Sequence, residues 1–296
     1  MNKIIVTGGT GLVGKHLQKI LPHAFYLSSE DCDLTDIEKV RWVISSYEPN
    51  IVIHLAAKVG GIQDNLKYPA DYYDDNILIN TNILKVCKEY KVKRFIGILS
   101  TCIYPNMVEK YPMSEKDLFN GPPPPSNFSY AYAKRCLAVQ IDAYNKQYGT
   151  KYNYLIPCNL YGDHDNLHNE SKMHFITALL NKIKNSKDGK LNLLGTGKPL
   201  RQFMYAGDLA AIIKLVIDNK ITDSFNVAPN FNYSINEMAK IALKVTGKDY
   251  DIIYDKPHLD GQYRKDVSNN KLLKIFPLFK FTSLEDGLKQ VYDKIS

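Results

Sequence analysis

Eight residues near the N-terminus, Thr7-Gly8-Gly9-Thr10-Gly11-Leu12-Val13-Gly14, constrain the fold more than any other part of the sequence. An apolar, β-branched run at 4–6 precedes them, and a helical pattern over 12–21 follows. Glycines at a strand-to-helix turn let the backbone approach a pyrophosphate, and the helix N-terminus offers free amides and the positive end of its dipole. The alternative is a turn without a ligand. In this context we predict a dinucleotide-binding loop, formed by Gly8, Gly9, Thr10, Gly11, Leu12, Val13 and Gly14.

Short apolar runs alternate with longer helical patterns through the first half of the chain. We predict strands at 4–6, 25–27, 51–53, 95–99 and 152–157, and helices at 12–21, 36–47, 71–90 and from about 127 to 148. Strands that alternate with helices indicate a parallel sheet, and strands buried on both faces appear as continuous apolar runs. The predicted fold class is therefore α/β, a Rossmann-type doubly wound parallel sheet, with its ligand beyond the carboxyl ends of the strands.

The second half of the chain has a different pattern. A Pro-rich loop over 105–126 precedes the helix that ends at Gly149, and after Asn159 we expect a helix over 173–184 and a hairpin-like stretch near 191–203. A helix over 208–220 and a strand over 224–227 then return to the main sheet. We predict a cofactor domain of residues 1–160 and 205–228, and a smaller C-terminal substrate-binding lobe of residues 161–204 and 229–296.

Composition excludes several classes of protein. Lys and Arg number 38 against 31 Asp and Glu, and this net charge of +7 is spread along the chain without a basic run, so we expect no nucleic-acid partner. No apolar run reaches the ~18–20 residues of a membrane span, and the N-terminal run is too short for a signal peptide, which favours a cytoplasmic protein without membrane contact. Five scattered cysteines lack C-x-x-C spacing, so we expect reduced thiols, no disulfide framework and no metal site.

The residues that close the second strand bear on the choice of cofactor. An acid at that point bonds the ribose hydroxyls of NAD and repels the 2′-phosphate of NADP. Here two serines stand at the strand end, and Glu30 and Asp31 come one step later. Two serines can donate to a phosphate, and Lys15 follows the last loop glycine, so we predict NADP, used as NADPH. The residues predicted to bind this end of the cofactor are Ser28, Ser29, Asp33 and Leu34, the last two beside the adenine.

Tyr130 and Lys134 lie one helical turn apart on one helix face. A phenol with a pKa near 10 is a poor acid–base catalyst at neutral pH, and an ammonium beside it stabilises the phenolate. The spacing alone is common by chance. Here it follows a phosphate loop and an apolar strand that ends in Ser100, so we predict that the pair is catalytic.

Two further residues are ambiguous when each is taken alone. Cys102 follows the fourth strand, where α/β sheets place their sites, yet a free cysteine is more often an inert apolar filler. His174 is by itself more typical of a core histidine than of a catalytic one.

A resemblance to known proteins resolves this ambiguity. Over nearly its whole length the chain resembles the extended short-chain dehydrogenase/reductases and, among them, the GDP-L-fucose synthase family. The resemblance rests on His54-Leu-Ala-Ala-Lys-Val-Gly-Gly61, Ser100-Thr-Cys-Ile-Tyr-Pro105, Tyr130-Ala-Tyr-Ala-Lys134, Asn159-Leu-Tyr-Gly162, His164-Asp-Asn166, Gly195-Thr-Gly197 through Arg201-Gln-Phe203, Asp260-Gly261 and Lys265.

The resemblance implies a bifunctional enzyme, a 3,5-epimerase and NADPH-dependent 4-reductase that converts GDP-4-keto-6-deoxy-D-mannose to GDP-L-fucose. It makes Ser100, Tyr130 and Lys134 the reduction triad. Cys102 and His174 become the base and acid of epimerisation, because protons alpha to a ketone are acidic enough for a thiolate or histidine. The cofactor residues that it adds are Leu55, Ala56, Ala57, Tyr130, Lys134, Pro157, Asn159, Leu160 and His174. The substrate residues are Cys102, Asn159, Lys182, Leu194, Arg201, Asp260 and Lys265.

The chain departs from the family pattern at Leu194, where many members have tryptophan, at Asp163 in place of proline and at Cys158 in place of threonine.

The alternative functions differ in which of the predicted catalytic residues they would use. A reductase that acts only at carbon 4 of a GDP-4-keto-6-deoxy hexose or heptose would keep Tyr130 and leave Cys102 idle. Dehydratases carry an Asp-Glu pair where this chain has Cys-Ile, and regulators without catalysis lose the Tyr-Lys pair.

The resemblance also implies a homodimer formed through helices 71–90 and 130–148.

Overall fold

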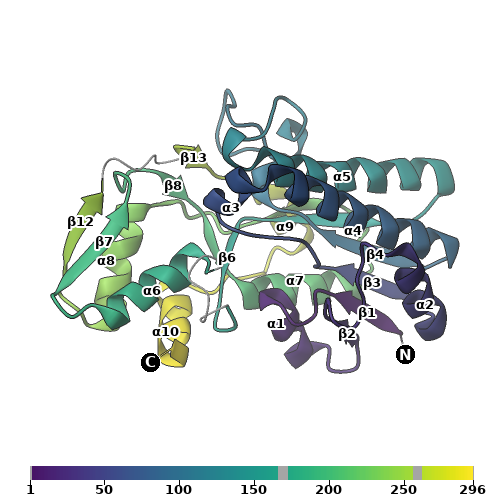
Figure 1. Ribbon diagram of the computed structural model, residues 1–296, viewed down its shortest axis with the longest axis horizontal. Coiled ribbons are helices and arrows are strands. Elements are labelled where there is room, and N and C mark those ends of the chain that lie inside the picture. The colour runs from purple at the N-terminus through teal and green to yellow at the C-terminus, as the bar shows by residue number, and fades with distance from the viewer. Residues whose placement is uncertain (1, 166–172, 256–261, 296) are drawn as a thin grey trace.

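Six parallel strands form the main sheet of the protein (Figure 1). The computed structural model describes residues 2–165, 173–255 and 262–295. The strand order is β10-β5-β4-β3-β1-β2, and every neighbouring pair is parallel. The strands are β1 (Ile4–Thr7), β2 (Phe25–Leu27), β3 (Ile51–His54), β4 (Arg94–Ile98), β5 (Asn153–Pro157) and β10 (Phe225–Val227). The predicted Rossmann-type fold class is confirmed. The strand predicted at 224–227 is β10, and it joins this sheet as expected.

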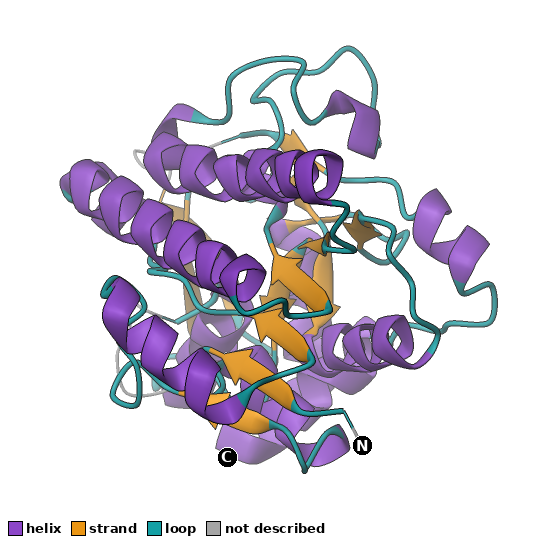
Figure 2. Cartoon of the chain, turned by 90° about the vertical axis from the view of Figure 1, so that its right-hand side faces the viewer, coloured by secondary structure: helices purple, strands orange, loops and turns teal. Residues whose placement is uncertain are grey.

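Helices cover both faces of the sheet (Figure 2). One face carries α2 (Ile37–Tyr47), α4 (Pro69–Glu89) and α5 (Phe128–Tyr148), and the other carries α1 (Leu12–Ile20) and α7 (Ala206–Asp218). The Asp36 carboxylate accepts from the backbone amides of residues 38 and 39 and so starts α2. Gly149, in the left-handed conformation at φ 65°, ends α5. These helix boundaries lie within a few residues of those predicted.

The apolar side chains gather in two cores. The first lies between the main sheet and its helices, where Ile5, Val52 and Phe95 have no exposed surface. The second is formed by the smaller lobe, from α6 (Phe175–Asn185), α8 (Ile235–Thr246) and α10 (Leu284–Ile295) with β7 (Lys190–Leu194) and β9 (Phe203–Tyr205). Val267 and Leu272, near the C-terminus, belong to the first core. The division of the chain into two domains at the stated residues stays a prediction.

Strand pairing in the smaller lobe joins distant segments. The predicted hairpin near 191–203 is wrong, because β7 (Lys190–Leu194) pairs in parallel with β12 (Asp251–Asp255). After two glycines with positive φ, β8 (Leu200–Arg201) joins a different sheet. It pairs there with β11 (Tyr233–Ser234), antiparallel, and with β13 (Arg264–Lys265), parallel. Between the two parts of the protein, β6 (Asn159–Tyr161) pairs in parallel with β9 (Phe203–Tyr205).

The structure also contains short elements that the sequence pattern does not predict. A six-residue helix, α3 (Ile62–Lys67), precedes α4. Among the residues that the structure describes, 3₁₀ turns interrupt the loops at Thr101–Ile103, Glu115–Asp117 and Pro125–Asn127. Among the described residues, no helix combines the length and apolar character that crossing a membrane requires.

Candidate active site

A cleft of about 720 Å³ opens at the carboxyl ends of β1, β2 and β3. Its wall includes most of the predicted cofactor residues, namely Gly8, Thr10, Gly11, Leu12, Val13, Gly14, Ser28, Ser29, Asp33, Leu34, Leu55, Ala56, Ala57, Leu160 and His174. Residues from five separate segments therefore meet around one elongated space. The other predicted cofactor residues do not line it: Gly9, Tyr130, Lys134, Pro157 and Asn159.

The glycines of the phosphate loop leave room for a ligand and for close packing. Gly8 has φ +68°, and a Cβ there would lie 2.8 Å from the Ala56 amide nitrogen. A Cβ on Gly14 would lie 2.3 Å from the carbonyl oxygen of Gly9, so a side chain would separate the helix from the loop. Gly11 is the N-cap of α1 without a side-chain cap, which leaves the first-turn amides for an anion. This loop and cleft fit a dinucleotide diphosphate.

Gly9, which we predicted to bind the cofactor, makes its contacts in this structure within the fold. Its amide donates to the Leu27 carbonyl (2.8 Å), and its carbonyl accepts from the Gln18 side chain (3.0 Å). A Cβ on Gly9 would lie 2.7 Å from the Cβ of Tyr26. Gly9 therefore holds the loop against β2, and its backbone groups are already bonded within the fold.

A buried polar chain connects the phosphate-loop strand to the helix that carries Tyr130 and Lys134. His54 Nδ1 lies 2.8 Å from Thr7 Oγ1, and its Nε2 lies 3.0 Å from Asn80 Oδ1. Asn80 in turn donates to the Ala133 carbonyl (3.3 Å). Burial, with a smaller contribution from the Lys134 ammonium, lowers the pKa of His54 to about 3. The ring is therefore neutral, and since Asn80 Oδ1 only accepts, Nε2 carries the proton.

The candidate catalytic residues come together at the end of β4. Ser100 follows this strand, and its Oγ accepts from the Cys102 amide (3.4 Å) at the start of the 3₁₀ turn. Cys102 is only 3% exposed. The first two turns of α5 carry Tyr130 and Lys134, and the Lys134 ammonium donates to the Ile98 carbonyl (2.9 Å). A strand end and a helix start thus bring the predicted reduction residues and the cysteine into one place.

The electrostatics of this cluster differ from the expectation for the tyrosine. Burial, with a smaller electrostatic contribution from Cys102, raises the pKa of Tyr130 above its ordinary value, so the phenol keeps its proton at neutral pH. Burial lowers the pKa of Lys134 to about 8, and a smaller electrostatic contribution from Cys102 opposes this shift. The Lys134 ammonium donates one of its protons to the Ile98 carbonyl, and the expected stabilisation of a phenolate by Lys134 stays a prediction. A protonated tyrosine suits a proton donor.

Lys265 is a second cation near Cys102. Burial lowers the pKa of Lys265, an electrostatic contribution from Cys102 opposes this shift, and the Arg201 charge adds to it. Arg201 and Lys265 are cross-strand partners in β8 and β13. The structure therefore brings Cys102 together with two predicted substrate residues as well as with the reduction residues.

His174 forms a pair with a carboxylate that sequence reasoning did not single out. His174 Nδ1 lies 2.8 Å from Asp165 Oδ1, and its backbone amide donates to Asp165 Oδ2 (3.0 Å). The Asp165 side chain is 4% exposed, and although burial opposes it, the hydrogen bonds from His174 hold the pKa of Asp165 below its ordinary value. Asp165 therefore fixes the ring at the N-cap of α6, where His174 lines the cofactor cleft. The spacing of nine residues in sequence gave no local signal of this pair.

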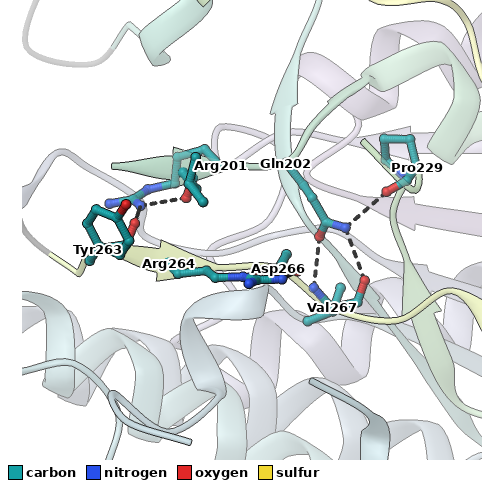
Figure 3. Close-up of polar contacts among 8 residues, drawn as sticks. Arg201, Gln202, Pro229, Tyr263, Arg264, Asp266 and Val267 are labelled. Atoms are coloured by element: carbon teal, nitrogen blue, oxygen red, sulfur yellow. Dashed lines mark hydrogen bonds and ion pairs between the residues drawn. The ribbon is translucent and has the colours of Figure 1, made fainter. Parts of the chain in front are cut away.

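Gln202, which the sequence also did not single out, clamps three segments together beside Arg201 (Figure 3). Its Nε2 donates to the carbonyls of Pro229 (2.9 Å) and Val267 (3.0 Å), and its Oε1 accepts from the Val267 amide (2.9 Å). The predicted residue Asn159 donates to the Gln202 carbonyl (2.8 Å). Gln202 is 3% exposed, so these bonds are shielded from water. They set the position of β8 against the segment that carries Lys265.

The other predicted substrate residues lie farther out on the lobe. Lys182 on α6 donates to the Asn192 carbonyl (3.1 Å), and Leu194 ends β7 with 58% of its surface exposed. Pro157, which we predicted to bind the cofactor, ends β5 within the main sheet. Asp260 lies outside the described residues. The roles assigned to the individual site residues stay predictions.

Comparison with known proteins defines the class. Residues 4–228 match the model of the NAD dependent epimerase/dehydratase family, and the chain belongs to this family. A GDP-L-fucose synthase of Dictyostelium discoideum is 40% identical over 97% of this chain and 93% of its own length. The Escherichia coli GDP-L-fucose synthase is 31% identical over 98% and 95%. The crystal structure of a GDP-L-fucose synthetase from Naegleria fowleri bound to NADP superposes with a TM-score of 0.90 at 34% identity, over 99% of this chain and 92% of that one. Within the wider family, the chain belongs with the GDP-L-fucose synthases.

Proposed function

We propose that the protein is a bifunctional enzyme, a 3,5-epimerase and NADPH-dependent 4-reductase that converts GDP-4-keto-6-deoxy-D-mannose to GDP-L-fucose. One observation supports the double activity above all. The buried Cys102 lies within electrostatic reach of Tyr130, Lys134 and Lys265, so a base for epimerisation shares a site with the proton donor for reduction. The relatives named GDP-L-fucose synthase support the choice of sugar.

Epimerisation requires a base, an acid and stabilisation of the charge between them. The Cys102 sulfur removes the proton alpha to the ketone, and the ammonium groups of Lys134 and Lys265 stand near the negative charge that develops on the enolate. His174, held by Asp165, returns a proton to the opposite face of the enolate, so the proton balance of each epimerisation is zero. The Cys102 amide donates to Ser100 Oγ at the start of a 3₁₀ turn, which holds the backbone that carries the thiol.

Reduction uses the same site after the sugar is inverted. NADPH would be held by the phosphate loop and the cleft wall, and when bound it supplies the hydride to carbon 4. Tyr130 donates its proton to the new alkoxide and becomes a phenolate. The positive charge of Lys134 stabilises this phenolate. The Lys134 ammonium is fixed by the Ile98 carbonyl, so it acts without a change of position.

Recognition of the GDP diphosphate is assigned to the cations of the small lobe. Arg201 and Lys265 are cross-strand neighbours, and a diphosphate requires such cations. The Arg201 guanidinium also donates to the carbonyls of Leu200 (2.8 Å) and Tyr263 (3.3 Å), which fixes its plane (Figure 3). Burial of Lys265 favours a bound anion, because an anion compensates the cost of desolvating the ammonium.

Product analysis tests this proposal. The purified chain is incubated with GDP-4-keto-6-deoxy-D-mannose and NADPH, and the product sugar is identified by NMR. GDP-L-fucose is the expected product. A GDP-6-deoxy sugar with unchanged configuration at carbons 3 and 5 would favour the carbon-4 reductase instead.

We also propose a homodimer and a cytosolic location. The long helices α4 and α5 pack side by side (Figure 1) and expose Tyr73, Leu78, Tyr132 and Val139, an apolar surface suited to a second copy. Analytical ultracentrifugation of the wild type and of Val139→Glu tests this: the wild type should sediment as a dimer and the variant as a monomer. All five cysteines are free thiols, which suits a reducing compartment.

A further inference from the structure

The adenosine end of the cofactor cleft carries a carboxylate at a position that the order of residues does not reveal. Asp31 Oδ2 accepts from the backbone amide of Ser28 (2.8 Å) and from the Ser28 hydroxyl (2.6 Å). Ser28 follows β2 and lines the cleft. In dinucleotide-binding folds an acid at this strand end bonds the ribose hydroxyls. Asp31 reaches back to that point, so the chain has the charge of a strand-end acid although a serine occupies the strand end.

The bond to Asp31 uses the only proton of the Ser28 hydroxyl. The same oxygen accepts from the backbone amides of Glu30 and Asp31, each at 3.2 Å. Ser28 therefore has no proton left to donate to a 2′-phosphate. The sequence led us to expect that both serines donate to the phosphate, but in this structure a neighbouring carboxylate holds the proton of Ser28.

Negative charge gathers around this point. Asp33 Oδ1 accepts from the Thr35 amide (3.0 Å) and the Thr35 hydroxyl (2.7 Å). Hydrogen bonds from Ser28 lower the pKa of Asp31, and hydrogen bonds from Thr35 lower the pKa of Asp33, so both carboxylates are ionised at neutral pH. Glu30 stands between them in the sequence. A doubly charged phosphate placed here meets carboxylates of its own sign.

Two lysines near this end of the cleft are paired with carboxylates. Lys39 lies 3.9 Å from Asp36 Oδ2 on α2, and its charge adds to the lowering of the pKa of Asp33 by Thr35. Lys58 donates to Asp75 (2.7 Å) on α4. Both lysines therefore face carboxylates of the protein.

We propose that Asp31 is the residue that determines cofactor preference in this enzyme, and that by occupying Ser28 and repelling a 2′-phosphate it allows NADH to bind nearly as well as NADPH. The inference rests on the proposed NADPH-dependent reduction and refines it. NADPH stays a cofactor, but its 2′-phosphate contributes little to affinity while Asp31 is charged. Removal of that charge strengthens the binding of NADPH and leaves the binding of NADH nearly unchanged.

Calorimetric titration of the full chain with NADPH and with NADH, at low and at physiological salt, tests the proposal. The wild type should bind the two cofactors with Kd values within about tenfold of each other. Asp31→Asn removes the charge and keeps the shape, so it should tighten NADPH binding about fivefold at low salt and less at high salt. Asp31→Ala also frees the Ser28 hydroxyl and should tighten NADPH binding at least as much.

Glu38→Gln is the matched control, since it removes one exposed carboxylate from the neighbouring helix α2 without touching Ser28. Its Kd for NADPH should stay within about twofold of the wild type. An unchanged ratio of NADPH to NADH affinity in Asp31→Asn, or a wild-type preference for NADPH above about a hundredfold, would overturn the proposal. Because the titration contains no sugar, its outcome is independent of whether the proposed GDP-sugar reaction is correct.

Discussion

Replacement of Gln202 by leucine separates the role of the clamp from that of the catalytic residues. The change removes three hydrogen bonds and leaves the Pro229 carbonyl and both backbone groups of Val267 buried without their partner. Each buried backbone group left unsatisfied costs about 1–3 kcal/mol, so we expect a loss of about 3–5 kcal/mol in the free energy of unfolding. That is a large part of the ~5–15 kcal/mol of a typical domain.

The functional effect should be selective. Gln202 fixes β8, which carries Arg201, against the segment that carries Lys265, whereas the cofactor cleft is built from other elements. Gln202→Leu should therefore raise KM for the GDP-sugar about tenfold and leave the Kd of NADPH unchanged, which steady-state kinetics and calorimetry measure. Gln202→Glu keeps the acceptor for the Val267 amide but directs a carboxylate at two carbonyls, and it should lose stability similarly.

Urea unfolding followed by circular dichroism gives the stability, with Gln147→Leu on the exposed side of α5 as the control. The control should change the free energy of unfolding by no more than about 0.5 kcal/mol. If Gln202→Leu lost less than about 1 kcal/mol and kept the wild-type KM, the clamp would have neither the structural nor the positioning role assigned to it.

The remaining predictions concern single groups. Tyr130→Phe should lower kcat by about 10²–10⁴-fold while the variant still binds NADPH, and near-normal turnover in stopped-flow assays would refute the proton-donor role. Asp165→Asn should slow epimerisation by up to about a hundredfold with little change in NADPH affinity, because His174 loses its orienting partner; equal rates in both enzymes would contradict this. Burial lowers the pKa of His54 from 6.5 to about 3, so below pH 6.5 the unfolded chain binds a proton that the folded chain does not. Stability should therefore fall as pH drops from about 6.5 toward 3, with a similar contribution from His16, whose pKa is lowered to about 4. Urea unfolding between pH 7 and 4 should show a smaller slope in His54→Asn, and an unchanged slope would refute it.

The sequence predicts those features that local patterns encode. The main-sheet strands could be predicted because each is a short apolar run bounded by turns, and the phosphate loop because its glycines directly follow one of them. Contacts between distant segments leave no such pattern. Gln202 bonds to carbonyls 27 and 65 residues away in the sequence, and β7 pairs with β12, which comes after α8 in the chain.

The polar partners of the site escape prediction for a second reason. Asp31 is an ordinary acidic turn residue in the sequence, and only the fold of the turn places its carboxylate on Ser28. Asp165 belongs to a motif used for the resemblance, but its bond to His174 depends on where α6 begins. The raised pKa of Tyr130 follows from burial, which the Tyr-x-x-x-Lys spacing does not express.

Exchange of hydrogen for deuterium tests the central claim, that one site both inverts and reduces the sugar. The wild-type chain is incubated with GDP-4-keto-6-deoxy-D-mannose in deuterated water without NADPH, and label at carbons 3 and 5 is followed by NMR. The proposed mechanism predicts incorporation at both carbons, sharply reduced in Cys102→Ser and altered in His174→Gln, because neither replacement titrates near neutral pH. Unchanged label in both variants would contradict the roles of Cys102 and His174. No incorporation in the wild type would contradict the epimerase itself and leave only a reductase of carbon 4.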